Sequence, residues 1–356
     1  MLKNHIPIFI VLIFFGSIIG CKTDPLLNEI IDSKPTPYNL EIPKGFSQFA
    51  IPADTPITEQ GVELGRHLFY DPILSGNNTQ SCASCHKQKF AFTDSTNRYS
   101  VGITGAVGTR NAMPIFNLGW SKLFFWDGRA PSLETQALEP VTNPIEMHES
   151  WANAIKELQA NPKYIAMYKA AFGSEQISPQ LTGRAISQFM RTLLSGNSRY
   201  DKWFRKELNF TAQEIRGFNI YNQFDNDKPG HCVHCHTNGS TFTDFEFRNN
   251  GLDSVSSDLG LMGVSGQPND RGKFKTPSLR NLLFTSPYMH DGRFKTLMEV
   301  IDFYDNGFHY PVNIDANMSK MPRAKMTLQD KQDLIAFLRT LSDSTLLTDT
   351  RFSSPF

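Results

Sequence analysis

Two stretches of this chain, residues 82–86 and 232–236, share the pattern Cys-x-x-Cys-His. Two thiols one short turn apart can each add to a vinyl group of the same porphyrin, and the histidine that follows can offer an imidazole nitrogen to the iron. The sequence has five cysteines, and these stretches contain four of them. The repeated pattern therefore predicts two covalently bound c-type haems. The predicted attachment and iron-ligating residues are Cys82, Cys85, His86, Cys232, Cys235 and His236.

Two other kinds of site also use paired cysteines. Four thiolates can hold a structural zinc ion, and a single Cys-x-x-Cys pair can act as a redox dithiol. Neither explains why a histidine directly follows each pair, so we favour the haem interpretation. His234, which lies between the second pair of cysteines, is interpreted as a surface residue and not as a ligand.

The fifth cysteine, Cys21, ends a largely apolar N-terminal segment. Residues 8–19 follow a lysine at position 3, and Gly20 comes directly before Cys21. This pattern is typical of an export signal, and residues 18–21 resemble a bacterial lipobox, which predicts cleavage before Cys21 and lipidation of its thiol. The lipid would hold the protein on a membrane surface in the periplasm without spanning the membrane. A signal peptide cut elsewhere, leaving a free thiol, is the alternative.

Length and charge limit the architecture. The 356 residues are enough for about two domains after a signal peptide. The 35 basic and 35 acidic side chains balance, so no basic excess indicates nucleic-acid binding. The 28 phenylalanines are enough to line two apolar haem cavities. We predict a signal peptide (1–20), a tether (21–45), an N-terminal haem domain (46–205), a C-terminal haem domain (206–345) and a tail (346–356).

Apolar periodicity and capping residues predict a mainly α fold with long irregular loops. Residues 90–126 and 238–271 show little periodicity, no segment has a convincing strand pattern, and the tail from residue 342 is expected to be loose. The predicted helices cover residues 58–70, 151–172 with a break near residue 162, 178–194, 211–224 and 327–341.

The two halves repeat a longer pattern. Pro114 and the segment 126–133 follow the first motif, and Pro277 and the segment 290–297 follow the second. Both segments read x-Asp-Gly-Arg-x-x-x-Leu. Asp-Gly alone indicates only a turn, but its paired placement predicts two cytochrome c-like haem domains related by duplication.

Several strings, in this order, resemble the bacterial dihaem cytochrome c peroxidase family, which includes the MauG-like enzymes. The resemblance extends from about residue 51 to residue 341. The matching strings are Leu68–Ser75, Ser81–His86, Gly108–Asn111, Phe125–Ala130, Glu146–Met147, Thr276–Asn281 and Pro287–Gly292.

The resemblance implies a peroxide-reacting haem at His86 and an electron-transferring haem at His236. It places Trp126 between the haems, and Gln136 and Glu146 beside the peroxide. It also implies a calcium ion between the domains, held by the side chain of Asn111 and the carbonyls of Thr285 and Pro287.

Glu146 fits this role on chemical grounds as well. Cleavage of the peroxide O–O bond requires that a proton move from one oxygen to the other, and a carboxylate within reach of both can act as base and then as acid. Gln136 can orient peroxide without titrating. The alternatives are solvated surface roles for Glu146 and Gln136, and ordinary core packing for Trp126.

One departure from the family pattern concerns the iron of the first haem. Many peroxidases of this family have a histidine that ligates the peroxide-reacting iron in the resting enzyme and leaves on partial reduction. That place falls near Ile103, and no histidine lies between His86 and His148. We therefore expect this iron to be open or water-bound at rest, without reductive activation.

The other departure concerns the second iron. In the peroxidases its second ligand is a methionine, and the matching position here is Tyr304, as in MauG-like enzymes. A phenolate stabilises ferric iron and lowers its potential, whereas a methionine does the reverse. We favour Tyr304 as this ligand, with Met318 or Met321 as alternatives and a packed helical role for Tyr304 as another.

Together these features predict an enzyme that reduces hydrogen peroxide to water with electrons from a small periplasmic cytochrome c or cupredoxin. One alternative is a MauG-like oxidase that uses peroxide to oxidise a protein or organic substrate. Another is a dihaem electron carrier without catalysis, which would have no need for Gln136 and Glu146. Relatives of this kind are commonly dimers, which suggests a homodimer.

Overall fold

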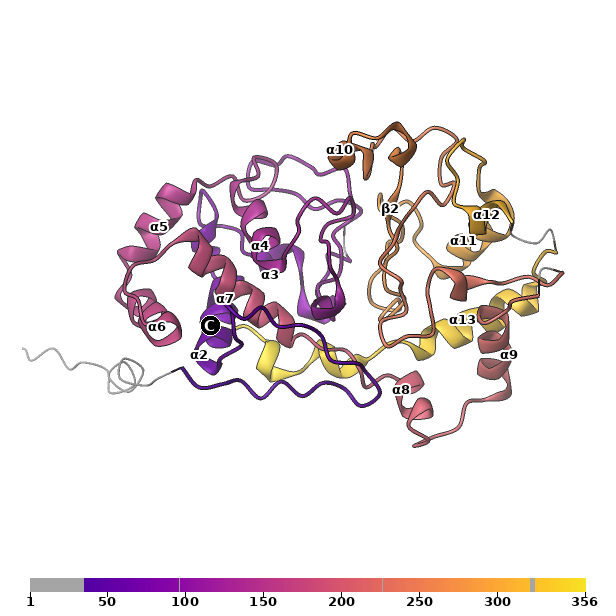
Figure 1. Cartoon of the computed structure of the whole chain (residues 1–356), viewed down its shortest axis with the longest axis horizontal. Helices are drawn as coiled ribbons and strands as arrows, with labels where there is room; N and C mark the ends of the chain where they lie inside the picture. Colours follow the sequence, from indigo (N-terminus) through magenta and orange to yellow (C-terminus); the bar gives the residue numbers. More distant parts are fainter. Residues whose placement is uncertain (1–34, 96, 226, 321–323) are drawn as a thin grey trace, which may run out of the picture.

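The computed structural model describes residues 35–95, 97–225, 227–320 and 324–356. The predicted signal peptide, the lipidation site Cys21 and Met321 lie outside these ranges. The chain forms two mainly helical lobes side by side (Figure 1), which confirms the predicted helical class. Within the described ranges, no helix is both long enough and apolar enough to cross a membrane.

The N-terminal lobe is built around the packing of α2 against α7. The Thr58 side chain accepts a hydrogen bond from Gly61 N at the start of α2, and Asp71 ends this helix. Asn161 caps α6 directly before Pro162, which explains the predicted break. The helices of this lobe are α2 (Glu59–Tyr70), α3 (Cys82–Cys85), α4 (Leu133–Thr142), α5 (Trp151–Gln159), α6 (Pro162–Phe172) and α7 (Pro179–Thr192).

The C-terminal lobe is built around α9 and α13. Thr211 and Glu214 form the predicted capping box of α9, which ends at Tyr221, three residues before the predicted end. Contrary to expectation, this lobe has two short antiparallel strands. Its elements are α8 (Arg199–Phe204), α9 (Ala212–Tyr221), β1 (Phe247–Arg248), α10 (Met262–Ser265), β2 (Phe274–Lys275), α11 (Leu297–Asp302), a π-helix (Phe303–Gly307), α12 (Ala316–Ser319) and α13 (Leu328–Thr340).

Both lobes pack their main helix pair across a glycine. A Cβ at Gly65 of α2 would lie 1.9 Å from the Ala185 carbonyl oxygen of α7. A Cβ at Gly217 of α9 would lie 1.9 Å from the Asp333 carbonyl oxygen of α13. The close backbone approach therefore recurs in both lobes, and their duplication stays a prediction.

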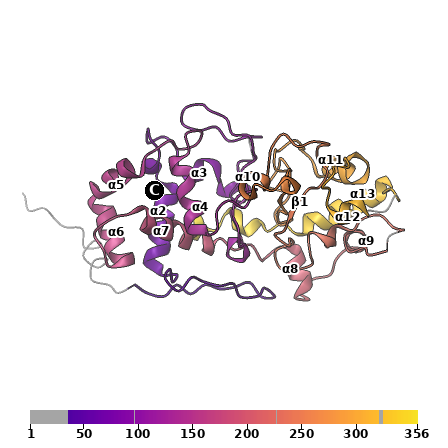
Figure 2. The ribbon, with the colours of Figure 1, turned by 45° about the horizontal axis from the view of Figure 1, so that its top comes forward.

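The ends of the described chain are packed against the lobes. Tyr38, within the segment predicted to be a tether, packs against the N-terminal core. The tail was expected to be loose, but it runs back from α13 to α2 (Figures 1 and 2) and buries Leu346 and Phe352 in that core. Arg66 Nε donates to the Ser353 carbonyl at 2.7 Å, so the tail is fixed to α2.

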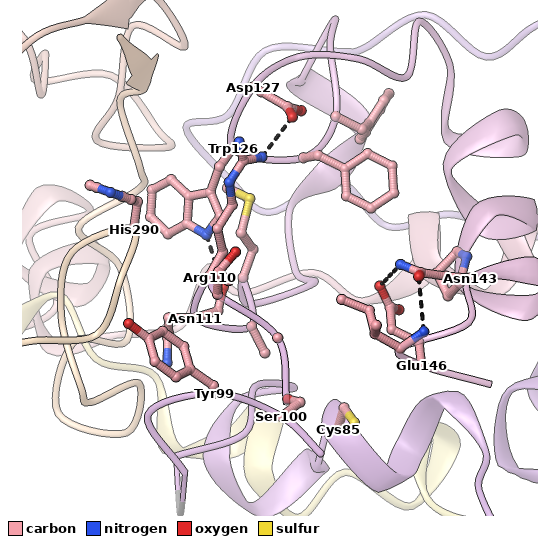
Figure 3. A pocket seen from close by; sticks show the side chains of 18 of the residues that line it. Cys85, Tyr99, Ser100, Arg110, Asn111, Trp126, Asp127, Asn143, Glu146 and His290 are labelled. Carbon is pink, nitrogen blue, oxygen red and sulfur yellow. Dashed lines mark hydrogen bonds and ion pairs between the residues drawn. The ribbon is translucent and has the colours of Figure 1, made fainter. Parts of the chain in front are cut away.

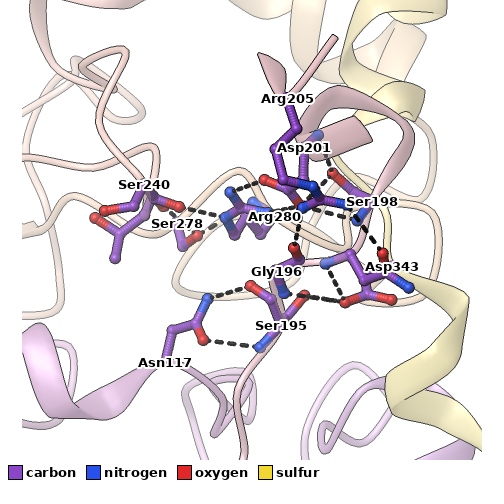
Figure 4. Close-up of polar contacts among 12 residues, drawn as sticks. Asn117, Ser195, Gly196, Ser198, Asp201, Arg205, Ser240, Ser278, Arg280 and Asp343 are labelled. Atoms are coloured by element: carbon purple, nitrogen blue, oxygen red, sulfur yellow. Dashed lines mark hydrogen bonds and ion pairs between the residues drawn. The ribbon is translucent and has the colours of Figure 1, made fainter. Parts of the chain in front are cut away.

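A buried polar network joins the lobes (Figure 4). Arg280 is 1% exposed and donates two hydrogen bonds to Asp201, at 2.9 and 2.7 Å. Asp343 accepts hydrogen bonds from the backbone N–H groups of Gly196 and Asn197, at 3.0 and 2.9 Å. The contacts of Asp343 fix the linker between α7 and α8 to the segment that follows α13, and the Arg280–Asp201 pair holds α8 in place.

Candidate functional site

The first Cys-x-x-Cys-His motif opens onto a cavity of about 1190 Å³. Cys82 and Cys85 begin and end α3, and His86 directly follows the helix. The His86 Nδ1–H donates to the Phe92 carbonyl at 3.0 Å, which leaves Nε2 as the nitrogen with a free lone pair. Burial lowers the pKa of His86 and so keeps the ring in its neutral, ligating form.

The second motif lines a separate cavity of about 330 Å³. The His236 Nδ1–H donates to the Pro277 carbonyl at 3.1 Å, so this ring is oriented in the same way as His86. Burial lowers the pKa of His236 to about 4. His234 is exposed, as expected.

These residues fit two covalently bound haems. The four motif cysteines are free thiols that line the cavities. Each motif therefore offers two thiols and one neutral imidazole to the same space, which is the donor set that haem c attachment requires. When bound, the haems would supply redox-active iron.

Glu146 lies on one side of the first cavity (Figure 3). Asn143 ends α4, and its Nδ2 donates to Glu146 Oε1 at 2.6 Å. Burial raises the pKa of Glu146, although the hydrogen bond from Asn143 and the charge of Arg129 lower it in part. A carboxyl group with a raised pKa inside a cavity is suited to accept and return a proton.

Gln136 projects from α4 into the same cavity. Among the described residues, its Oε1 is the one buried side-chain polar atom without a hydrogen-bond partner. A buried acceptor of this kind is costly unless a ligand or water satisfies it. Gln136 is therefore suited to bind a hydroxyl group in the cavity.

The loop around Ile103 packs against the backbone that carries Glu146. Ile103 N donates to the Glu146 carbonyl at 2.9 Å, and Gln80 Nε2 donates to the Val101 carbonyl at 2.8 Å. A Cβ at Gly102 would lie 2.3 Å from the Ile145 carbonyl oxygen. The loop therefore lies directly against the segment 145–146.

Trp126 lines both cavities. It lies on the side of the first cavity opposite Glu146, beside His290 (Figure 3). The indole Nε1–H donates to the Asn111 carbonyl at 2.9 Å, and Asn111 N donates to the His290 carbonyl at 2.7 Å. Trp126 is thus a buried aromatic side chain in the wall between the two spaces.

Tyr304 and Met318 both line the second cavity with His236. Tyr304 belongs to the π-helix, a feature that is frequent at functional sites. Its hydroxyl accepts a hydrogen bond from Asn250 Nδ2 at 3.1 Å. The second cavity therefore holds a phenol and a thioether that are both candidate iron ligands.

The predicted calcium ligands Asn111, Thr285 and Pro287 all border the second cavity. Asn111 Nδ2 donates to the Arg98 carbonyl at 3.0 Å. In the described ranges, no cluster of three or more His, Cys, Asp or Glu side chains is arranged to hold a metal ion. A calcium site here would therefore depend on neutral amide and carbonyl oxygens, and it stays a prediction.

Sequence reasoning missed residues that support the site. Asn143 gave no signal beyond its position three residues before Glu146. Arg110 and Asp258 form a bidentate pair between the lobes, at 2.7 and 2.8 Å, and both line the first cavity. Their separation in sequence explains why no local pattern could indicate this pair.

Comparisons with known proteins show which family the chain resembles. A family model described as di-haem cytochrome c peroxidase matches residues 59–209. The methylamine utilization protein MauG of Methylorubrum extorquens is 38% identical over 301 residues, which cover 82% of this chain and 80% of that protein. Cytochrome c551 peroxidase of Nitrosomonas europaea is 33% identical over 297 residues, covering 82% and 83% of the two chains.

Solved structures show the same architecture. The crystal structure of a MauG-like protein associated with microbial copper homeostasis has a TM-score of 0.82 and 37% sequence identity, and the match covers 89% of this chain and 99% of that one. The diheme peroxidase BthA from Burkholderia thailandensis has a TM-score of 0.71 at 24% identity, over 91% and 96% of the chains. The second likeness concerns the fold alone.

Proposed function

Because the chain belongs to the dihaem cytochrome c peroxidase family, which includes MauG, we propose that it reduces hydrogen peroxide at the first cavity with electrons that enter through the second. It is a peroxidase-type oxidoreductase with two c-type haems. One observation carries the proposal: the first cavity combines His86 with the half-buried carboxylate of Glu146 and the unpartnered amide oxygen of Gln136.

In this proposal Gln136 Oε1 accepts a hydrogen bond from peroxide and orients it. Glu146 takes a proton from the oxygen nearer the His86 side and returns it to the departing oxygen. The overall reaction consumes two electrons and two protons for each peroxide and yields two water molecules. The electrons pass the wall that contains Trp126, and a small periplasmic cytochrome c or cupredoxin supplies them.

Replacement of Glu146 tests this mechanism. Glu146→Gln keeps the size and one hydrogen-bonding oxygen but removes the proton-transferring carboxylate, so kcat for peroxide reduction should fall by about 100-fold or more. Glu175→Gln, which changes an exposed carboxylate, is the control and should keep full activity. Unchanged turnover in Glu146→Gln with full haem content would contradict the proton-transfer role of Glu146, and absence of turnover in the haem-loaded parent protein would favour a dihaem electron carrier.

We further propose that Tyr304 is the second ligand of the C-terminal iron, with Met318 or Met321 as alternatives. The shared cavity and the hydrogen bond from Asn250 support Tyr304. Tyr304→Phe should therefore alter the absorption spectrum and the potential of this haem, whereas Met318→Leu should leave both unchanged. The opposite pattern would identify Met318 as the ligand.

A MauG-like oxidase is the second candidate. The 38% identity to MauG and the tyrosine at position 304 favour it. In that case the two electrons that reduce peroxide would be withdrawn from a protein or organic substrate, which becomes oxidised, and a donor protein would not supply them. A peroxidase assay with reduced cytochrome c separates the two, because only the first function consumes the donor stoichiometrically.

The proposed setting is the periplasm, with Cys21 lipidated on a membrane surface. We also propose a structural calcium ion at Asn111, Thr285 and Pro287, which line one cavity, and assembly as a homodimer. Electrospray mass of the mature chain, calcium content after dialysis and light scattering test these three points in turn.

A further inference from the structure

The loop that carries Trp126 belongs to the N-terminal lobe but is held by β2 of the C-terminal lobe. Lys275 N donates to the Trp126 carbonyl at 2.9 Å. The Lys275 ammonium donates to the Leu123 carbonyl at 2.7 Å and to Ser121 Oγ at 3.3 Å. One residue of the C-terminal lobe therefore binds both ends of the segment 121–126.

Lys275 is an unusual residue for this position because it is 5% exposed. Burial lowers its pKa to about 8. Its hydrogen-bonding partners are uncharged, and the ring of Phe124 lies 5.6 Å from Nζ. An apolar side chain would fill this space without the desolvation of a charge. The buried ammonium is explained if its hydrogen bonds hold the loop in place, which an apolar side chain could not do.

Other contacts fix the same loop. Phe247 of β1 packs on Gly128, where a Cβ would lie 2.4 Å from the ring Cζ. At the indole end, Trp126 Nε1 is bound to Asn111, which is itself bound to the backbone of His290 in the C-terminal lobe. The Trp126 side chain and backbone are thus both positioned by contacts that cross between the lobes.

We propose that Lys275 is a positioning residue that holds Trp126 between the two cavities and thereby sets the rate of electron passage between the haems. This inference rests on the proposed role of Trp126 in that passage. Lys275 lines the second cavity but not the first, and the hydrogen bonds of its ammonium go to the loop 121–126. It therefore acts on Trp126 through that loop.

The test measures electron transfer between the haems in the full, haem-loaded protein after rapid photoreduction of the C-terminal haem. Lys275→Met removes both side-chain hydrogen bonds but keeps the length and the buried apolar volume. We expect the transfer rate to fall by about tenfold, since a displacement of about 1 Å can cost about 100-fold where geometry controls a rate. Lys275→Arg, which keeps the charge and the donors, should restore most of the rate.

Lys273→Met is the matched control, because Lys273 lies two residues earlier and pairs with Asp270 of its own lobe at 3.0 Å. It should keep the parent rate. Lys275→Gln, which has an uncharged donor and a shorter reach, takes the place of Lys275→Met if the latter does not fold, with the same expected fall. Melting temperature and haem content are measured for every variant, because a purely structural role would change these and not the rate.

Trp126→Phe separates failure of this inference from failure of the proposed function. If Trp126→Phe slows transfer and Lys275→Met does not, the positioning role of Lys275 is overturned while the role of Trp126 stands. If Trp126→Phe leaves the rate unchanged, the proposed role of Trp126 fails, and the inference fails with it.

Discussion

The protonation state of Glu146 is set by two opposing influences. Burial raises its pKa, whereas the hydrogen bond from Asn143 and the charge of Arg129 favour the ionised form. The first step assigned to Glu146 requires the ionised carboxylate, because only that form can take a proton from peroxide. The acid limb of the pH profile should therefore lie above the usual range of a glutamate.

The Asn143→Ala variant should shift the acid limb of the pH profile to a still higher pH. The variant removes a 2.6 Å hydrogen bond that favours the carboxylate, so the pKa of Glu146 should rise and activity should be lost at a higher pH. The shift should be measurable, since a hydrogen bond to a charged group contributes about 1.5–3 kcal/mol. The profile of kcat/KM for peroxide measures it.

Asn153→Ala is the control, because Asn153 donates to Glu149 and Glu157, which do not line the cavity. Its profile should match that of the parent protein. An acid limb that stays in place, or moves to lower pH, in Asn143→Ala would show that Glu146 is not the titrating base.

At the scale of elements, the sequence was most informative where local signals decide the structure. Capping residues and prolines predicted α2, α6 and α7 nearly to the residue, because their determinants lie within one turn. The tail packs on α2 through contacts with residues more than 250 positions away, such as Arg66 with Ser353. No local pattern could predict that packing.

The same difference between local and long-range signals holds for the residues of the candidate site. Motif spacing indicated His86 and His236 directly, and the structure lines two cavities with these motifs. The supporting residues Asn143 and Lys275 were not predicted. Their importance comes from partners that only the folded chain brings close, namely Glu146 and the loop 121–126.

The close packing of each main helix pair across a glycine can be tested by substitution. Gly65→Ala would place a Cβ against the Ala185 carbonyl and force α2 and α7 apart, so we expect a loss of about 1–3 kcal/mol in the free energy of unfolding. Chemical denaturation measures it. Gly263→Ala in the exposed α10 has no atom closer than 3.7 Å and should be neutral or slightly stabilising. Equal stability of both variants would refute the close crossing.

The whole molecule is held as a unit by contacts between the lobes. Burial alone would raise the pKa of Asp201, but hydrogen bonds from Arg280 and Ser198 outweigh it and lower the pKa. Removal of one partner from a buried pair of this kind leaves an uncompensated charge. This pair fixes α8 within the C-terminal lobe. The backbone contact of Lys275 with Trp126 and the packing of the tail on α2 join the two lobes.

The fixed arrangement bears on how the enzyme starts its reaction. The position near Ile103 carries no histidine, and the loop there is bound to the backbone of Glu146. We therefore expect the first iron to accept peroxide in the fully oxidised protein, with Gln136 and Glu146 already in place.

Stopped-flow absorbance of the fully oxidised, haem-loaded protein mixed with one equivalent of hydrogen peroxide tests this central claim most directly. The account predicts a rapid change in the haem spectrum without prior reduction, and a much slower change in Glu146→Gln under the same conditions. A spectrum that stays constant until one haem has been reduced would contradict an open first iron. A spectrum that stays constant even then would contradict peroxide chemistry at this site altogether.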